Sequence, residues 1–254
     1  MLLQSRPREI FRRVSGKLQN MRIFDSRNLY KLWELQQLER VFRTYNVDCV
    51  FDIGANVGQY AWMIRKNLGF KGLIISFEPI PEAAALIRNK ARGDSSWIVE
   101  EQVVGPRDGT QEFNVMRDSQ FSSISTPRDM GLNLFGDATE IKNQIVVKSE
   151  TLANAYVRMA ARYKFFRPFL KMDTQGFDCE VVASGRRVLS QFVGLQSELA
   201  IKKIYLHSKD FREALALYES HGFSLSSFVP NNGGQFPHLV ETDCIMIRND
   251  LCNS

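Results

Sequence analysis

Short apolar runs alternate along the chain with stretches in which apolar residues return every three or four positions. Runs of four to eight apolar residues predict buried strands, whereas the wider spacing predicts amphipathic helices. The predicted strands cover residues 49–53, 73–77, 97–104, 169–172, 193–199, 223–229 and 243–247. Because helices are predicted between most of them, the pattern indicates an α/β fold on a mostly parallel sheet.

The helices follow from the same pattern. They are predicted over about residues 29–45, 57–68, 151–163 and 211–218, with shorter ones near Pro81 and Phe177. Residues 118–144 have no such periodicity and form either a lid over a site or a hairpin with polar turns, beside short strands at 112–116 and 145–148. The last two strands flank a loop at 230–238, which predicts a late antiparallel hairpin.

The front of the chain is distinguished by its charge. Much of the basic excess behind the formal net charge of +5 lies in residues 1–28, where apolar residues recur at helical spacing. Such a segment forms either a peripheral membrane contact or a helix packed on the domain or on a partner subunit, which leaves a homo-oligomer open. We predict a helical extension, residues 1–46, followed by one domain, residues 47–254.

The candidate chemistry begins at the end of the first strand. Asp52 precedes a turn with Gly54 and Gly58, after which a helix starts, and Glu78 follows the second strand twenty positions later. Glycines allow a ligand to approach the backbone, and the free N–H groups of the helix start face it. An acid at this distance is the group that takes ribose hydroxyls in nucleotide-binding βαβ units. The pattern predicts a cofactor that carries an adenosine.

The identity of that cofactor is argued from the loop. Its spacing is G-x-x-x-G with Asn56 in the middle, whereas a dinucleotide fingerprint is G-x-G-x-x-G. An acidic loop without basic neighbours suits the sulfonium and amino group of S-adenosylmethionine better than a pyrophosphate. An NAD-dependent oxidoreductase stays open as the alternative.

Acids also end later strands. Asp173 follows the strand at 169–172, and Glu198 lies within the strand at 193–199. Ligands of open parallel sheets bind at the carboxyl ends of strands, so we expect Asp52, Glu78 and Asp173 to share one edge. Asp173 and Glu198 are the candidate general base for a hydroxyl acceptor, or ligands of a divalent metal, and either could instead be structural. His238, in the glycine-containing loop, is a third candidate.

Several motifs resemble, in order, those of the FkbM-type methyltransferases. They are FDIGANVGQY at 51–60, FEP at 77–79, LKMDTQG at 170–176, QSE at 196–198 and ETDCI at 241–245. The resemblance covers roughly residues 47–248 and implies a class I methyltransferase Rossmann-like fold, with a mostly parallel seven-stranded sheet and a late antiparallel strand. It also implies O-methylation of hydroxyls on sugars, glycolipids or natural products.

The resemblance extends the candidate cofactor contacts. It adds Tyr60 and Pro79 from the quoted motifs and Ser123 from a segment near cofactor and substrate. The end of the third strand borders adenine in this fold, which adds Glu101, Gln102 and Val103. The sequence departs from the family pattern at Asp178, where relatives carry Glu. A role at that position therefore does not transfer.

Composition narrows the class of protein further. With 254 residues, 44% of them hydrophobic, the chain can bury one large core. Its four cysteines are scattered without C-x-x-C spacing, and no apolar run reaches the length of a membrane span, which favours the cytoplasm. No basic run with interleaved aromatics follows the front, so we expect a small-molecule or glycan acceptor and no nucleic acid. A catalytically silent cofactor-binding scaffold is the remaining alternative.

Overall fold

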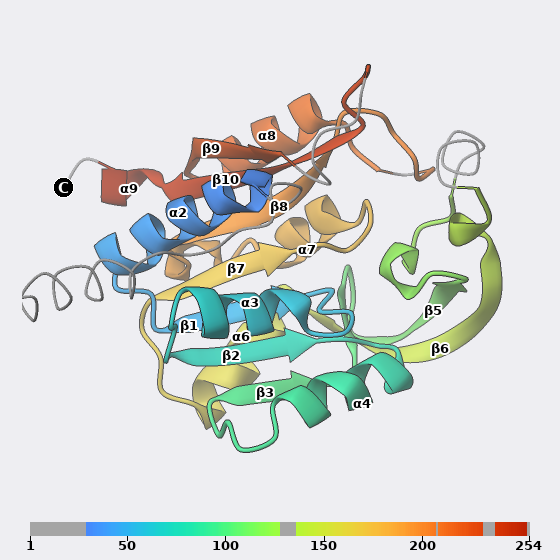
Figure 1. The fold of residues 1–254 in the computed structure, drawn as a ribbon, viewed down its shortest axis with the longest axis horizontal. Coiled ribbons are helices and arrows are strands. Elements are labelled where there is room, and N and C mark those ends of the chain that lie inside the picture. Colours follow the sequence, from blue (N-terminus) through green and yellow to red (C-terminus); the bar gives the residue numbers. More distant parts are fainter. Residues whose placement is uncertain (1–28, 128–135, 207, 231–236, 253–254) are drawn as a thin grey trace, which may run out of the picture.

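The protein is built on a seven-stranded sheet in a computed structural model that describes residues 29–127, 136–206, 208–230 and 237–252. The strands are β1 (Cys49–Ile53), β2 (Leu73–Phe77), β3 (Trp97–Glu100), β7 (Pro168–Met172), β8 (Gly194–Ala200), β9 (Phe223–Pro230) and β10 (Glu241–Arg248). Their order is β3-β2-β1-β7-β8-β10-β9, and only β10 runs antiparallel to its neighbours. The predicted mostly parallel sheet with a late antiparallel strand is confirmed (Figure 1).

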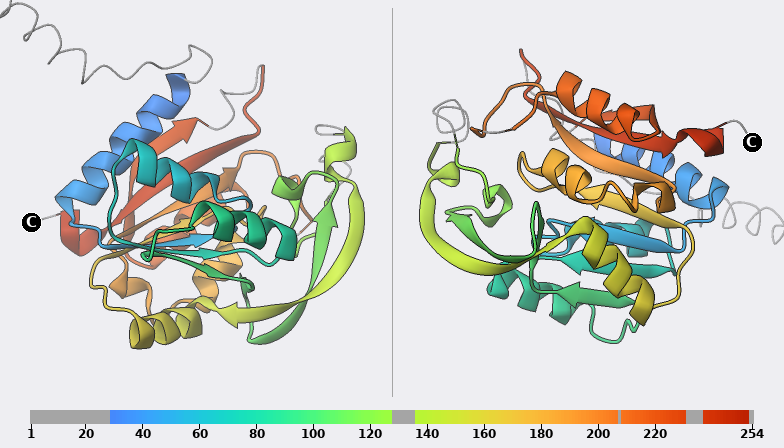
Figure 2. Two further views of the ribbon diagram at one scale, coloured as in Figure 1. Left: turned by 60° about the horizontal axis from the view of Figure 1, so that its bottom comes forward. Right: turned by 180° about the vertical axis from the view of Figure 1, so that it is seen from behind.

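Helices cover both faces of this sheet. On one face lie α2 (Leu29–Thr44), α3 (Gln59–Asn67) and α4 (Pro81–Lys90), and on the other lie α6 (Leu152–Arg162), α7 (Asp178–Ser184) and α8 (Phe211–Ser220), while α9 (Asn249–Cys252) follows β10. Figure 2 shows the second set in front when the molecule is seen from behind. The chain is thus a three-layer α/β sandwich, as the alternating pattern predicts.

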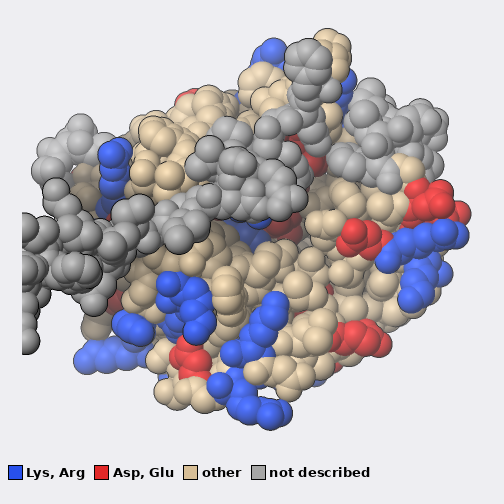
Figure 3. Space-filling model, in the orientation of Figure 1, with Lys and Arg blue, Asp and Glu red and all other residues tan. Residues whose placement is uncertain are grey.

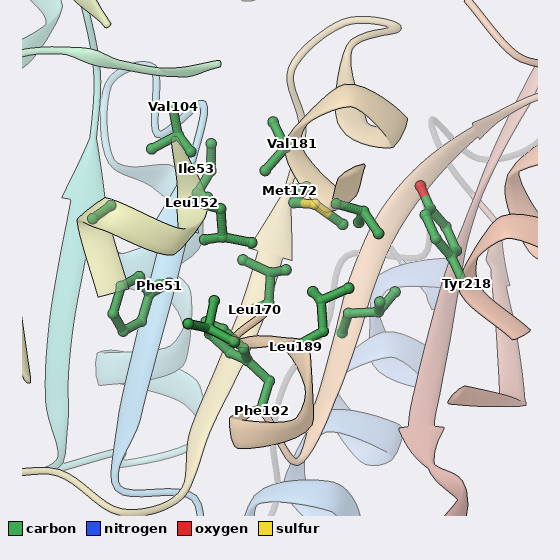
Figure 4. Close-up of a cluster of buried hydrophobic side chains, with 14 of the residues drawn as sticks. Phe51, Ile53, Val104, Leu152, Leu170, Met172, Val181, Leu189, Phe192 and Tyr218 are labelled. Carbon is green, nitrogen blue, oxygen red and sulfur yellow. The ribbon is translucent and has the colours of Figure 1, made fainter. Parts of the chain in front are cut away.

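The core follows the two-residue period of the strands. All five residues of β1 are buried, and alternate side chains enter opposite layers. Phe51 points into the α6 and α7 layer, where it contacts Phe165 and Phe192 edge to face at 5.6 and 5.4 Å between ring centroids (Figure 4). Full burial of one such side chain stabilises the fold by about 1.5–3 kcal/mol. Because Phe51 lies two residues before the end of β1, its packing holds the end of the strand that leads into the glycine loop.

The single strand predicted at 97–104 is wrong: the structure has two strands there, and the second belongs to a separate three-stranded sheet. The chain leaves the main sheet after Glu100, turns with a hydrogen bond from the Gln102 N–H to the Glu100 carbonyl (3.0 Å), and starts β4 (Val103–Gly105). β4 pairs with β6 (Ile141–Thr151), which also pairs with β5 (Gly109–Met116). No glycine or proline marks this turn, so the sequence predicts one strand where the structure has two.

β5 and β6 form a hairpin that brackets the irregular region, of which residues 128–135 lie outside the described part of the chain. β6 is much longer than the predicted strand at 145–148, because Lys142, Asn143 and Gln144 near its start are polar and exposed and interrupt the apolar signal. The hairpin extends beyond the main sheet in Figure 1. Its connection includes two short 3-10 helices, η2 (Ser119–Phe121) and η3 (Gly136–Thr139).

The helix predicted at 29–45 is confirmed as α2. Its Leu38, Val41 and Phe42 pack in the same cluster as residues of α3 and β1. The basic amphipathic segment proposed for residues 1–28, with its membrane contact, lies outside the described residues. Within the described part of the chain, none of the helices has both the length and the apolar character required to cross a bilayer.

Candidate active site

A cavity of about 310 Å³ lies at the carboxyl ends of the central strands. The loop after β1 and the residues that follow β2 and β7 form its floor, and η2 borders it on the side of the small sheet. The charged residues that line it are Lys31, Glu34, Glu78, Asp173, Glu198, Glu241 and Asp243. This position is where open parallel sheets bind ligands.

A buried polar row crosses the sheet below this cavity. Asp52 pairs in register with Ser76 and Lys171, and Lys171 pairs with Gln196. The Lys171 ammonium lies 3.3 Å from Asp52 and 3.7 Å from Asp173, and the Ser76 hydroxyl donates to Asp52 at 3.1 Å. Burial raises the pKa of Asp52, and its partners oppose that shift.

The expectation that Asp52 shares the rim with Glu78 and Asp173 is therefore wrong. Asp52 is the penultimate residue of β1, whereas Glu78 and Asp173 come directly after the last residues of their strands. Asp52 is in register with Ser76, two residues before Glu78, and two residues along a strand span about 6.6 Å. Asp52 therefore lies below the edge of the sheet at which Glu78 lies. Its side chain is 0% exposed and does not line the cavity.

The glycine loop is held against the ends of β2 and β7. Gly54 has φ 73°, and a Cβ there would lie 2.0 Å from the carbonyl oxygen of Asp173. The backbone N–H groups of Asn56 and Ile80 donate to the two Glu78 carboxylate oxygens at 2.8 and 2.9 Å. Burial raises the pKa of Glu78 to about 7. Glu78 lines the cavity, and a carboxylate oxygen that accepts one hydrogen bond keeps capacity for another.

Two other candidates lie behind the loop. Gly58, with φ 77°, caps α3, and a Cβ there would contact Ile87 and Trp97 at 3.2–3.3 Å. Tyr60 is buried with the Lys171 ammonium 5.4 Å from its ring centroid. Neither residue lines the cavity, so both can act on a ligand only through the shape of the loop.

The turn after β3 directs some of the predicted adenine contacts away from the cavity and others into it. Glu101 is exposed and forms an ion pair with Arg88 at 2.8 Å, and Gln102 donates to Glu150 at 2.6 Å. Neither lines the cavity, whereas the third candidate of this segment, Val103, and the candidate Pro79 do, as does Val104.

Ser123 is buried beneath the cavity and lies outside its lining. Its hydroxyl contacts the carbonyls of Thr174 and Gln175 at 3.1 and 3.0 Å. The residues on either side of it, Ser122 and Ile124, do line the cavity. Ser119 connects this segment to the glycine loop, because its hydroxyl donates to the Asn56 side chain at 3.0 Å.

The structure brings together two of the three candidates for catalysis. Asp173 and Glu198 both line the cavity and both accept from the Gln175 amide, at 2.9 and 3.2 Å. Burial, with Glu241 and Asp173 nearby, raises the pKa of Glu198. His238 is exposed and does not belong to the cavity lining.

Sequence reasoning missed four charged residues of the cavity. Lys31 and Glu34 come from α2, and Glu241 and Asp243 come from β10. The acids of β10 lie in one of the recognised motifs, but only the strand order shows that β10 lies beside β8. Among the described residues no three His, Cys, Asp or Glu side chains are grouped to hold a metal ion.

The strand order and the glycine loop together define a class I methyltransferase: six strands share one direction, the seventh is inserted antiparallel, and an acid follows the second strand. A family comparison makes the assignment specific, because residues 52–225 match the methyltransferase FkbM domain. The match covers more than half of the chain, which therefore belongs to this family of S-adenosylmethionine-dependent methyltransferases.

Comparison with solved structures returns proteins of similar fold at low sequence identity. The FkbM methyltransferase from Methylobacillus flagellatus KT is 13% identical with a TM-score of 0.47, over 79% of this chain and 43% of that chain. This chain thus spans less than half of that protein. A Methanococcus jannaschii fibrillarin pre-rRNA processing protein is 10% identical with a TM-score of 0.47, over 81% and 68%.

A third structure is magnesium protoporphyrin IX methyltransferase from Synechocystis PCC 6803 with bound S-adenosylmethionine. It is 9% identical with a TM-score of 0.46, over 90% of this chain and 86% of that chain. A search of curated protein sequences found no match.

Proposed function

We propose that the protein transfers a methyl group from S-adenosylmethionine to a hydroxyl of a sugar, a glycolipid or a secondary metabolite. The observation that carries the proposal is Glu78, a carboxylate that lines the cavity and accepts backbone hydrogen bonds from Asn56 of the glycine loop and from Ile80 before α4. Ribose hydroxyls donate to carboxylates of this kind at the second strand of nucleotide-binding units. The family match supports the same donor.

The residues present fit the cofactor. Gly54 has no side chain at the point where the loop packs against the backbone of Asp173. The Glu78 carboxylate would accept hydrogen bonds from the ribose hydroxyls. Pro79, Val103 and Phe113 give the adjoining wall an apolar surface for adenine. When bound, the cofactor supplies an electrophilic methyl group on a sulfonium.

Asp173 is the proposed general base, with Glu198 as its partner. A hydroxyl is a poor nucleophile at neutral pH, so a carboxylate within hydrogen-bond reach must accept its proton. Asp173 follows β7, which lies beside β1 and its glycine loop, and Gln175 fixes Asp173 relative to Glu198. The exposed position of His238 gives no support for it as the base.

Methyl transfer from labelled S-adenosylmethionine into a fractionated extract tests the proposal. We expect a labelled small molecule or glycan, and about 10²–10⁴-fold slower turnover for Asp173→Asn, with donor binding retained. Glu219→Gln, an exposed acid outside the cavity lining, is the matched control and should behave as wild type. Donor binding without transfer to any fraction would instead support the catalytically silent scaffold.

The family match argues against the NAD-dependent oxidoreductase that the glycine spacing left open. A cytoplasmic location stays part of the proposal. It is supported by Cys49, Cys179 and Cys244, which are buried free thiols of the kind that reducing compartments maintain.

A further inference from the structure

One wall of the cavity is strongly acidic. Five carboxylates line it, and we call them the acidic wall: Glu34, Asp173, Glu198, Glu241 and Asp243. They come from α2, the end of β7, β8 and β10. In Figure 3, which views the molecule from the side of α2, α3 and α4, acidic atoms are visible in the hollow near the centre.

The strand register places these acids on one face. Glu198 lies directly opposite Asp243 in the antiparallel β8–β10 pair, so their side chains are cross-strand neighbours. Glu241 precedes Asp243 by two residues and therefore points to the same face. Like charges in this arrangement repel each other, which a folded protein tolerates only with compensation.

Among the described residues, two amides supply part of that compensation. One amide, Gln196, donates to both Glu34 and Asp243, at 2.8 and 3.1 Å, as Gln175 does to Asp173 and Glu198. Glu241 is 6% exposed and lines the cavity, and no described residue forms a hydrogen bond or ion pair with its carboxylate.

Two lysines face the acidic wall. Lys171 lies 3.7 Å from Asp173, but its closer partner is Asp52 in the row below. Lys31 is exposed on α2, at the edge of the cavity, and its charge lowers the pKa of Glu34 against the larger effect of burial. Among the described residues that line this cavity, Lys31 is the one cation, and Lys171 is shared with Asp52.

Burial and mutual repulsion raise the pKa values of the acids on β10. Burial and the charge of Asp173 raise the pKa of Glu241 to about 7, and burial with Glu34 and Asp173 nearby raises that of Asp243. A bound cation would relieve both the repulsion and the desolvation.

The acidic wall extends away from the donor loop. β10 is three strands from β1 in the sheet order, a distance of roughly 14 Å at the usual strand spacing. The methyl donor proposed above lies over β1 and β2, so the acids of β10 and α2 face the space left for the acceptor.

We propose that the acidic wall binds a protonated amine of the methyl acceptor, so that the substrate is an amine-bearing sugar or metabolite with its hydroxyl directed to Asp173. The inference rests on the proposed function and specifies its substrate class. Spread over three strands and a helix, the carboxylates suit an extended organic cation. Among the described residues they do not form a group that could hold a metal ion.

The test uses glucosamine and spermidine as probes, with N-acetylglucosamine and triacetylspermidine as neutral counterparts. Binding to the full chain is measured by calorimetry with S-adenosylhomocysteine present, and donor binding is measured separately on the same variants. We expect at least one amine to bind and its neutral counterpart not to bind. Glu241→Gln should weaken amine binding at least about tenfold and leave donor affinity unchanged.

Asp243→Asn is the second variant, in case Glu241→Gln fails to fold, and Glu219→Gln is the control. If no amine binds while S-adenosylmethionine does, or if neutral counterparts bind equally, the inference fails and the proposed function stands. Magnesium chloride that binds and displaces the amine would also overturn it. If the wild type does not bind S-adenosylmethionine, the proposed function itself fails.

Discussion

At the residue scale, Glu78 links the glycine loop to the end of β2. Its two carboxylate oxygens accept from the backbone of Asn56 and Ile80, and burial holds its pKa at about 7, well above the ordinary value. The ionised form is the better acceptor for ribose hydroxyls. Binding of the methyl donor should therefore require that Glu78 loses its proton, which it does near pH 7.

This predicts a pH-dependent affinity for S-adenosylmethionine. Below pH 7 the protonated carboxyl must first lose its proton, so affinity should rise as pH increases through about 7, by about tenfold between pH 6 and pH 8. Calorimetry across this range measures it. Glu78→Gln should bind more weakly with a flat profile, and Glu82→Gln, an exposed acid on α4, should follow the wild type. A profile that keeps its slope in Glu78→Gln would assign the titration elsewhere.

Gly54 gives a second prediction at this scale. Gly54→Ala adds a Cβ 2.0 Å from the Asp173 carbonyl oxygen at a φ of 73°, so backbone must move. Gly93→Ala is the matched control, because its φ is 85° and no atom lies within 4 Å of the added Cβ. Left-handed backbone alone costs about 1–2 kcal/mol, and we expect Gly54→Ala to exceed this by at least about 2 kcal/mol in chemical denaturation. Equal losses would mean that the loop accommodates the methyl group.

At the element scale, Asp178 binds the turn after β7 to β8. It accepts from the Thr174 N–H, the Thr174 hydroxyl, the Ser197 hydroxyl at 2.7 Å and the Glu198 N–H at 3.2 Å. The two cavity acids Asp173 and Glu198 lie in the segments that it joins. Asp178 is thus a positioning residue, and a role for its carboxylate emerges from this structure where family resemblance gives none.

Asp178→Asn should therefore destabilise the protein. The amide NH₂ would face N–H and O–H donors, at a cost of about 2–3 kcal/mol, which lowers Tm by roughly 5–10 °C in a chain of this size. Thermal unfolding followed by circular dichroism measures it. Asp137→Asn, at an exposed position of η3, should leave Tm within about 1–2 °C. An unchanged Tm in Asp178→Asn would mean that the carboxyl is already protonated and donates one of these bonds.

Elements with a strong periodic signal were predictable from the sequence. The bounds of β1 and β2 agree with the predicted runs, because buried parallel strands are continuous apolar stretches. The break between β3 and β4 after Glu100 was not predictable, because no glycine or proline marks that turn. The length of β6 was not predictable either, because much of this strand is exposed. Glu78 and Asp173 were found in the cavity because acids after strands mark a sheet edge. Glu34 and Glu241 reach it through tertiary packing that local pattern does not encode.

At the scale of the whole molecule, charge is unevenly distributed. The formal net charge is +5, yet five carboxylates face one cavity wall. Confining like charges to a partly desolvated site lowers stability, and native proteins retain such sites mainly for function. The overall sign of the chain therefore gives no guide to the charge of its ligand.

Glu241→Gln should stabilise the unliganded protein in a pH-dependent way. With a pKa of about 7 in the folded state against an ordinary 4.5, Glu241 binds its proton more tightly when folded. Stability of the wild type should fall as pH rises from about 4.5 to 7, and the variant lacks this loss. Its gain should be near zero at pH 4.5 and about 3 kcal/mol at pH 8, measured by urea denaturation. A pH-independent difference would show that repacking, and not charge, is responsible.

The central claim is that the cavity at the carboxyl edge of the sheet holds S-adenosylmethionine through Glu78 and the glycine loop. Calorimetric titration of the full chain with S-adenosylmethionine and, separately, with NAD tests it most directly. We predict one donor molecule per chain with a Kd between about 1 µM and 1 mM, a markedly weaker Kd in Glu78→Gln, and no heat with NAD. Binding of NAD in place of S-adenosylmethionine, or an unchanged Kd in Glu78→Gln, would contradict the account.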